Sequence, residues 1–255
     1  MLFCVWAGGW WFAGLTAAAG LGLGMEWTAM CGFNVRVFPG WALPLGAAIV
    51  AILAATGEPR DAFLCAVAGA AIAAVWTAPI LGATDRPHRF ALVLGFPYIC
   101  LAALALPWLR ADPAVGWANT LFVLVVVWSS DIGAYAFGRL FGGPKLAPAI
   151  SPGKTWSGAV GGLISAALGA FAIAACFSLE FSSSHVLVAS VGLGVVSQTG
   201  DLLESAAKRH FGVKDSGHLI PGLGVLLDRL DALIMVAPAA ALIAYSVGRG
   251  VVLWR

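Results

Sequence analysis

Charged residues are scarce in this chain of 255 residues: they make up only 10% of the sequence, whereas hydrophobic residues make up 61%. Mean hydropathy is +0.94. Soluble domains carry about 25% charged and about 45–50% apolar residues, so this composition excludes an ordinary soluble domain. Several apolar runs approach the roughly 20 residues that a helix needs to cross a bilayer. The composition therefore predicts an all-α, polytopic integral membrane protein.

Cysteine motifs and a basic leader are also missing. The cysteines are scattered with no CxxC spacing, which favours small packing residues over disulfides or a metal site. They are Cys4, Cys31, Cys65, Cys100 and Cys176. No Lys or Arg precedes Arg36, so residues 1–25 lack the positive region of a cleaved signal peptide. We expect these residues to be a retained span or the remnant of one.

Apolar runs separated by polar segments predict about eight transmembrane helices and no β-sheet, because helices satisfy their own backbone groups in lipid. The expected spans are residues 3–25, 41–56, 62–82, 90–107, 116–137, 157–177, 186–203 and 231–247. Loops on one side hold ten Lys and Arg residues, whereas the other loops and the C-terminal tail hold four. The positive-inside rule places the side with ten in the cytoplasm.

The few charges are concentrated toward the C-terminal end, where nine of them fall between Asp201 and Asp231. Asp201, Glu204 and Lys208 recur at helical spacing and share one helix face. Asp228 and Asp231 are one turn apart on the next expected helix. Two such helices side by side would bring together hard oxygen ligands, which suit Mg²⁺. The expected metal ligands are Asp201, Asp228, Asp231 and Glu204.

Cations surround these acids and favour a polyphosphate ligand; they are Lys208, Arg209, Lys214 and Arg229. Asp215 follows Lys214 directly. A network of surface ion pairs is the alternative interpretation, but each such pair contributes little. That alternative also leaves the glycine-rich segment 217–224 unexplained, whereas a binding site uses glycines to let backbone approach a ligand.

A second polar stretch, Ser151-Pro-Gly-Lys154-Thr155, leads into the expected helix 157–177. Its Gly-Lys-Thr imitates the end of a P-loop, but Pro148 stands where a P-loop glycine would be and no strand is expected before it. The free N–H groups at a helix start still favour an anion. We expect Ser151, Lys154 and Thr155 to contact a substrate phosphate; a basic surface loop is the alternative.

A third candidate, Asp131, closes an apolar run that begins at Leu121. An acid at the centre of a bilayer costs roughly 2.5–3.5 kcal/mol, so it normally faces a cavity or a partner. We expect Asp131 to bind substrate. The alternative is a structural acid hydrogen-bonded to Ser129 or Tyr135.

Together these stretches resemble the phosphatidate cytidylyltransferase (CDP-diacylglycerol synthase) family. Two upstream pieces look like that family's motifs, Ser130-Asp131-x-Gly-Ala-Tyr135 and Ser151-Pro-x-Lys154-Thr155-Trp156. The family's C-terminal signature is matched by Ser205, Lys208, Arg209, Lys214, Asp215, Pro221, Gly222, Gly224, Asp228, Arg229 and Asp231.

The resemblance implies transfer of CMP from CTP to phosphatidic acid, with pyrophosphate as the second product. It implies an Mg²⁺ cofactor and leaves a second cation open. The implied partners are CTP, phosphatidic acid and membrane lipids but no nucleic acid, and a homodimer is left open. Catalytic roles are expected for Asp201, Asp228, Lys208, Arg229 and Asp231.

The expected organisation is one membrane domain, residues 1–255, with scaffold helices in 1–115 and the catalytic part in 116–247. The expected location is the inner (plasma) membrane of a bacterium, with the active site facing the cytoplasm. The chain begins almost at Gly8-Gly9-Trp10-Trp11, where the family has a further helix, so we expect that helix to be truncated.

Other functions stay open at this stage. A related CTP-dependent enzyme would use an archaeol or polyprenol acceptor. An inactive relative is suggested because Leu223-Gly224-Val225 replaces the family's His-Gly-Gly. A transporter using Asp131 and Asp201 is disfavoured, since transport predicts polar residues in several spans and here they lie at one end of a few helices.

Overall fold

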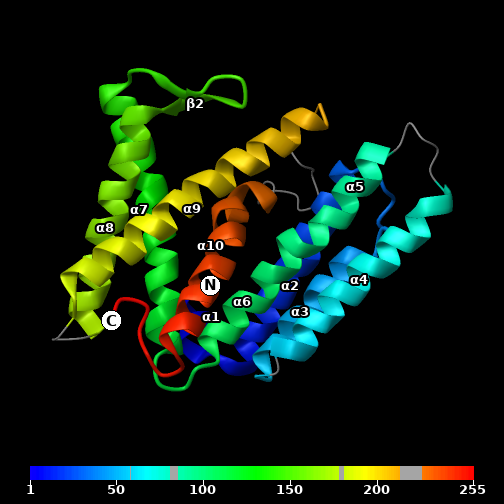
Figure 1. The fold of residues 1–255 in the computed structure, drawn as a ribbon, viewed down its shortest axis with the longest axis horizontal. Helices are drawn as coiled ribbons and strands as arrows, with labels where there is room; N and C mark the ends of the chain where they lie inside the picture. The colour runs from blue at the N-terminus through cyan, green and yellow to red at the C-terminus, as the bar shows by residue number, and fades with distance from the viewer. Residues whose placement is uncertain (58, 81–85, 178–180, 213–225) are drawn as a thin grey trace. The chain divides into compact units, whose positions relative to one another are not determined.

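The computed structural model describes residues 1–57, 59–80, 86–177, 181–212 and 226–255 (Figure 1). Two compact units form within the chain. The first combines Met1–Ala111 with His210–Leu230, and the second combines Asp112–Arg209 with Asp231–Arg255. Lys214, Asp215 and the loop around Leu223 and Val225 lie outside the described residues.

The first unit is helical and is organised around α3. Its elements are α1 (Leu2–Ala7), α2 (Gly9–Met30), α3 (Ala42–Ala55), α4 (Pro59–Ile80), α5 (Arg86–Gly95), the π-helical η2 (Phe96–Cys100) and α6 (Leu101–Arg110). Helix α3 packs against α2, α4 and α6. At Gly24 of α2 an added Cβ would lie 2.6 Å from the Pro44 backbone of α3. Small residues therefore let these helices approach closely, as helix packing in lipid requires.

The expected first span, 3–25, is interrupted in the structure at Gly8. Gly8 has a φ of +63°, which separates α1 from α2. Just beside this break, the Arg110 guanidinium donates from Nε to Val5 O (2.6 Å) and from Nη2 to Trp6 O (2.9 Å). These bonds satisfy carbonyls that the end of α1 leaves without helical partners. The hydropathy pattern carried no signal for this break.

The second unit contains the helices and the hairpin that carry the candidate site. Its elements are α7 (Gly116–Phe141), β1 (Lys145–Ala147), β2 (Ser151–Thr155), α8 (Trp156–Phe177), α9 (Ser183–His210) and α10 (Leu227–Val247), of which α10 joins this unit from Asp231 onward. Helices α7 and α8 pack extensively against each other (Figure 1). An added Cβ at Gly158 would lie 2.7 Å from Ala134 O, so this contact also depends on a glycine.

The expectation of no β-sheet is wrong in one place. Strands β1 and β2 form a two-stranded antiparallel sheet in which Lys145 pairs with Thr155 and Ala147 with Ser151. Gly142 and Gly143, both with positive φ, end α7 and turn the chain into this hairpin. The hairpin holds Lys154 on an ordered strand that leads directly into α8.

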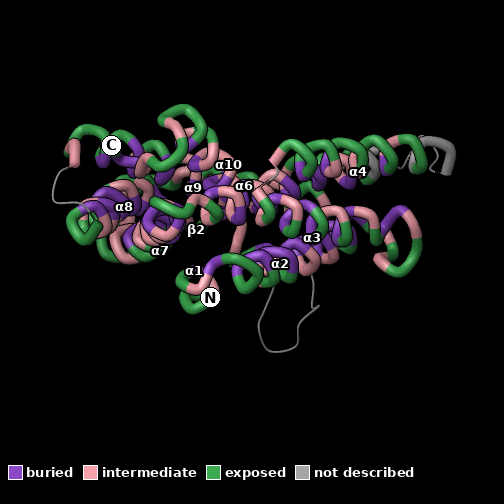
Figure 2. The backbone as a smooth tube through the Cα atoms, turned by 90° about the horizontal axis from the view of Figure 1, so that it is seen from below, coloured by how far each residue is buried: buried purple, intermediate pink, exposed green. Residues whose placement is uncertain are grey.

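The all-α membrane architecture is confirmed. Among the described residues, six helices are long and apolar enough to cross a membrane, and Ala42–Ala55 is a shorter apolar helix. Much of α4 is exposed (Figure 2), and beyond its first turn the exposed side chains are apolar, as a lipid-facing surface requires. They include Phe63, Leu64, Val67, Ile72, Val75 and Trp76. The number of eight spans stays a prediction.

The C-terminal tail, residues 248–255, is fixed to the start of α7. Asn119 accepts from Leu253 N (3.0 Å) and donates to Val251 O (3.2 Å). The indole of Trp254, which is fully buried, stacks on Phe122 with 4.7 Å between ring centroids. The tail therefore contributes a polar clamp and a buried aromatic pair to this unit.

Asp112 joins the same tail to the N-terminus of α7. Its carboxylate accepts from Gly250 N (2.8 Å), Ala114 N (2.9 Å) and Val115 N (3.1 Å). Burial alone would raise the pKa of Asp112, but these three donors and the nearby Arg249 outweigh it, so the pKa lies below its ordinary value.

Asp112→Asn should lower the melting temperature at neutral pH, because the carboxylate accepts three backbone hydrogen bonds and bonds to a charged acceptor are roughly twice as strong as bonds to a neutral one. Since the folded-state pKa is depressed, this contribution is present above the unfolded value of 3.8 and is lost as the pH falls through the folded-state value. Thermal unfolding in detergent should show the difference from wild type shrinking at low pH. Asp61→Asn, at an exposed acid in the first turn of α4, is the control. A difference that stays constant with pH would contradict this role.

Candidate active site

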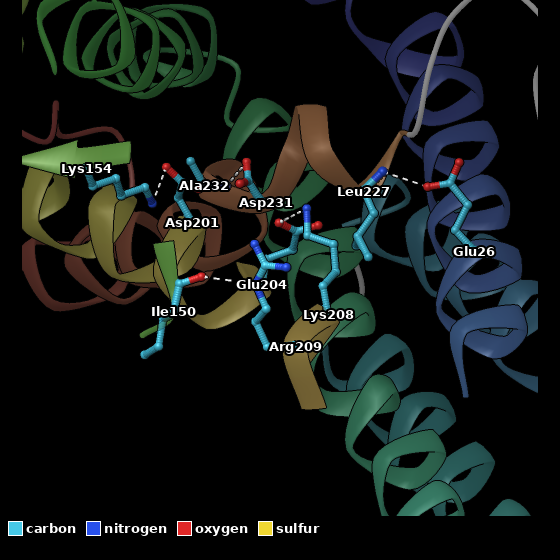
Figure 3. Close-up of polar contacts among 10 residues, drawn as sticks. All are labelled: Glu26, Ile150, Lys154, Asp201, Glu204, Lys208, Arg209, Leu227, Asp231 and Ala232. Carbon is cyan, nitrogen blue, oxygen red and sulfur yellow. Dashed lines mark hydrogen bonds and ion pairs between the residues drawn. The ribbon is translucent and has the colours of Figure 1, made fainter. Parts of the chain in front are cut away.

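Three carboxylates converge in the second unit, two from α9 and one from α10. One ligand oxygen from each of Asp201, Glu204 and Asp231 lies within 4.8 Å of the others. Glu204 is only 2% exposed, and the other two are half-buried. Gly200 makes this approach possible, because an added Cβ there would lie 3.0 Å from Asp231 O. The expected convergence of these acids is thus present (Figure 3).

Two lysines compensate part of this negative charge. Lys154 Nζ lies 2.6 Å from Asp201 Oδ2, and Lys208 Nζ lies 3.0 Å from Glu204 Oε2 (Figure 3). Asp231 Oδ1 accepts from the backbone N–H of Ala232 at 2.7 Å. Carboxylates this close repel one another unless cations are near them. Carboxylate oxygens gathered this closely are hard donors, which fit a divalent cation such as Mg²⁺.

A cavity of about 630 Å³ opens beside this cluster, lined by residues of α7, the hairpin, α8 and α9. This volume is in the range of small-molecule sites, about 300–1,000 Å³. Its wall combines acids with cations and neutral polar groups: Asp131, Tyr135, Arg139, Lys154, Gln198 and Asp201. A ligand with both phosphate and polar groups would find partners for each.

The α7 side of the cavity is a polar stripe at helical spacing, formed by Asp131, Tyr135 and Arg139. Arg139 Nη1 donates to Tyr135 Oη at 2.9 Å. Asp131 therefore faces a cavity, as expected for an acid in an apolar helix. Sequence reasoning did not select Tyr135 or Arg139 as site residues, although their spacing of four residues from one another was a usable signal.

Of the three expected phosphate-binding residues on the hairpin, two line the cavity and one does not. Lys154 and Thr155 line the cavity, whereas Ser151 is not among its lining residues. Thr155 Oγ1 accepts from Gly158 N at 3.1 Å and so caps the start of α8. Ser157, which also contacts Thr155 Oγ1, donates to Gly142 O and ties α8 to the end of α7. Lys154 is thus the hairpin residue whose charge reaches the carboxylates.

Arg209 contributes to the placement of the hairpin. Its Nε donates to Ile150 O, at the hairpin turn, over 3.4 Å (Figure 3).

Asp228 and Arg229 lie in the first turn of α10 and belong to the other compact unit, where both are exposed. One turn separates Asp228 from Asp231 along this helix.

Comparison with known proteins identifies the family of this chain. The sequence model described as the cytidylyltransferase family matches residues 1–247. A phosphatidate cytidylyltransferase of Brucella suis is 40% identical over 250 residues, which are 97% of this chain and 87% of that protein. One from Haemophilus influenzae is 44% identical over 136 residues, 50% of this chain and 46% of that protein.

A third relative, the phosphatidate cytidylyltransferase of Staphylococcus haemolyticus, is 47% identical over 120 residues, 46% of this chain and 45% of that protein. The shorter matches cover about half of this chain, whereas the Brucella match extends through nearly all of it. The resemblance drawn from the polar stretches is confirmed. This chain belongs to the cytidylyltransferase family.

Proposed function

We propose that this protein transfers CMP from CTP to phosphatidic acid, forming CDP-diacylglycerol and pyrophosphate. The observation that carries the proposal is the 40% identity, over 97% of the chain, to proteins named phosphatidate cytidylyltransferase. The acid cluster and the adjoining cavity supply what such a reaction needs. An oxygen of the lipid phosphate bonds to the α-phosphorus of CTP, and the bond from that phosphorus to the oxygen leading to the β-phosphate breaks.

The proposed metal ligands are Asp201, Glu204 and Asp231, together with Asp228 from the first turn of α10. Their oxygens fit Mg²⁺, which prefers carboxylates together with water and substrate phosphates. When bound, the ion would neutralise charge on the nucleotide phosphates and on the departing pyrophosphate. The second cation that the resemblance leaves open has no separate support here.

The cations have a complementary role in this proposal. Lys154 pairs with Asp201 of the acid cluster and also lines the cavity. Its ammonium would therefore contact a phosphate that is bound to the metal. Lys208 orients Glu204 through the ion pair between them. Arg229, Lys214 and Arg209 remain proposed phosphate contacts, since cations stabilise the charge that develops on transferring phosphoryl groups.

The acceptor needs little activation. A phosphate monoester has its second pKa near 6 and is largely ionised at neutral pH. No strong general base is therefore required, and Asp131 is proposed to orient a polar group of the substrate in the cavity. Asp215, Ser151 and Thr155 remain proposed binding residues on the basis of the family motif.

The protein is an integral membrane protein. We further propose that it lies in the inner membrane with the site facing the cytoplasm, where CTP is available. The single-domain organisation, with 1–115 as scaffold and 116–247 as the catalytic part, also remains a proposal, as does a homodimer.

The decisive assay uses purified protein in detergent with labelled CTP, Mg²⁺ and a panel of acceptors. Phosphatidic acid should give labelled CDP-diacylglycerol, and polyprenyl and archaeol phosphates should give little product. A preference for polyprenyl or archaeol phosphate would instead identify the protein as a related CTP-dependent lipid enzyme. No product with any acceptor would favour an inactive relative, as the Leu223 and Val225 replacements suggest.

Asp228→Asn and Asp201→Asn should each reduce product formation at least about a hundredfold, because each removes a charge from the site that holds the metal on the phosphates. The shape of the side chain is retained, so the variants should elute and melt like wild type. Initial rates should be measured over a wide range of Mg²⁺ concentrations. Near-normal turnover of one variant across that range would remove its residue from the ligand set.

Lys154→Ala should raise the KM for CTP or phosphatidate about tenfold and change kcat less, because a cation that binds phosphate alike in ground and transition states acts on KM. Lys154→Arg should recover only part of the loss, since the guanidinium differs in shape. Lys145→Ala removes the same charge from the exposed start of the same hairpin and is the matched control. Unchanged kinetic constants in Lys154→Ala would limit the hairpin to an anchoring role.

A further inference from the structure

A buried acid of α2 that the proposed chemistry does not use makes two backbone contacts. Glu26 is 1% exposed. Its Oε1 accepts from Leu226 N at 3.0 Å. Its Oε2 accepts from Leu227 N at 2.7 Å (Figure 3). Removing a carboxylate from water is costly unless it receives strong hydrogen bonds. These two charge-assisted bonds meet that requirement.

The two donors lie at the start of α10, whose first N–H groups have no partner within the helix. Such groups are usually capped by a side chain of the neighbouring chain segment. Here the cap comes from a residue 200 positions away, and its charge lies at the positive end of the helix dipole. Gly22, one turn earlier on α2, allows this approach, because an added Cβ would lie 2.7 Å from Leu226 Cδ2.

The capped turn leads into the proposed metal ligands. Asp228 directly follows Leu227, and Asp231 comes three residues later in the same helix. Asp231 is one of the three converging carboxylates. We infer that Glu26 is a positioning residue for the metal-binding carboxylates of α10. It fixes the first turn of that helix by a cap supplied from α2. The inference rests on the proposed function, in which these acids hold the metal.

The test measures Mn²⁺ binding to the purified full-length protein by electron paramagnetic resonance, without substrate or turnover. Glu26→Ala removes both acceptors, and Glu26→Gln keeps one oxygen but loses the charge. Mn²⁺ binding should weaken about tenfold or more in Glu26→Ala, in the range typical of residues that orient metal ligands, and less in Glu26→Gln. The apparent KM for Mg²⁺ should rise in the same order, with kcat largely restored at saturating Mg²⁺.

Trp27→Phe is the matched control for general destabilisation. Trp27 is the next residue on α2, and its Nε1 donates to Ala91 O of α5 at 2.9 Å instead of contacting α10. This variant should lose stability and still bind Mn²⁺ like wild type. An equal loss of Mn²⁺ affinity in Trp27→Phe would overturn the inference, because the effect would then not be specific to the cap.

Asp231→Asn separates failure of this inference from failure of the proposed function. If Asp231→Asn weakens Mn²⁺ binding while both Glu26 variants bind it normally, Glu26 is a structural cap only and the inference is wrong. If Asp231→Asn and Asp201→Asn also bind Mn²⁺ normally, the proposed metal site is wrong and the inference falls with it. Should Glu26→Ala not fold, as judged by size-exclusion chromatography, Glu26→Gln alone decides.

Discussion

Repulsion among Asp201, Glu204 and Asp231 is the constraint that governs the second unit. Their oxygens meet within 4.8 Å in a chain that is otherwise largely apolar. Ion pairs from Lys154 to Asp201 and from Lys208 to Glu204 offset the charge of two of these acids. Removal of Lys208 would take an ion pair from the buried Glu204, and removal of Lys154 would take one from the half-buried Asp201. The hairpin and the end of α9 therefore supply the cations that offset the charge of the acids, in addition to their proposed substrate contacts.

Glycine determines how closely these charges can meet. The hydrophobic effect does not drive apolar helices together in lipid, so their contact depends on small residues and interhelical hydrogen bonds. Gly200 allows α9 to approach Asp231, and Gly158 brings α8 against α7 where the cavity wall forms. Larger side chains at these two positions would separate the elements that carry the site. The apolar, glycine-rich composition is thus a requirement of the site as well as of the membrane.

Much of the fold could be predicted because hydropathy and backbone satisfaction in lipid leave few alternatives. Helical spacing placed Asp201 and Glu204 on one helix face, and their meeting with the acids of α10 was expected if the two helices lay side by side; of those acids, the observed group includes Asp231. The Lys145–Thr155 hairpin was missed because its strands are short and carry no alternating apolar pattern. Glu26 was missed for a different reason: its partners are backbone N–H groups two hundred residues away, and backbone donors leave no trace in a sequence pattern.

The Lys154–Asp201 pair has a consequence for the order of binding under the proposed function. A divalent cation at Asp201 would compete with the Lys154 ammonium, which lies 2.6 Å from the same carboxylate. Since like charges repel, a bound cation weakens the lysine's hold on Asp201. The lysine also lines the cavity, so a nucleotide phosphate arriving with the metal offers it a new anionic partner nearby. Exchange of one ion pair for another keeps the charge of the site balanced, and it makes binding of metal and of nucleotide favour each other.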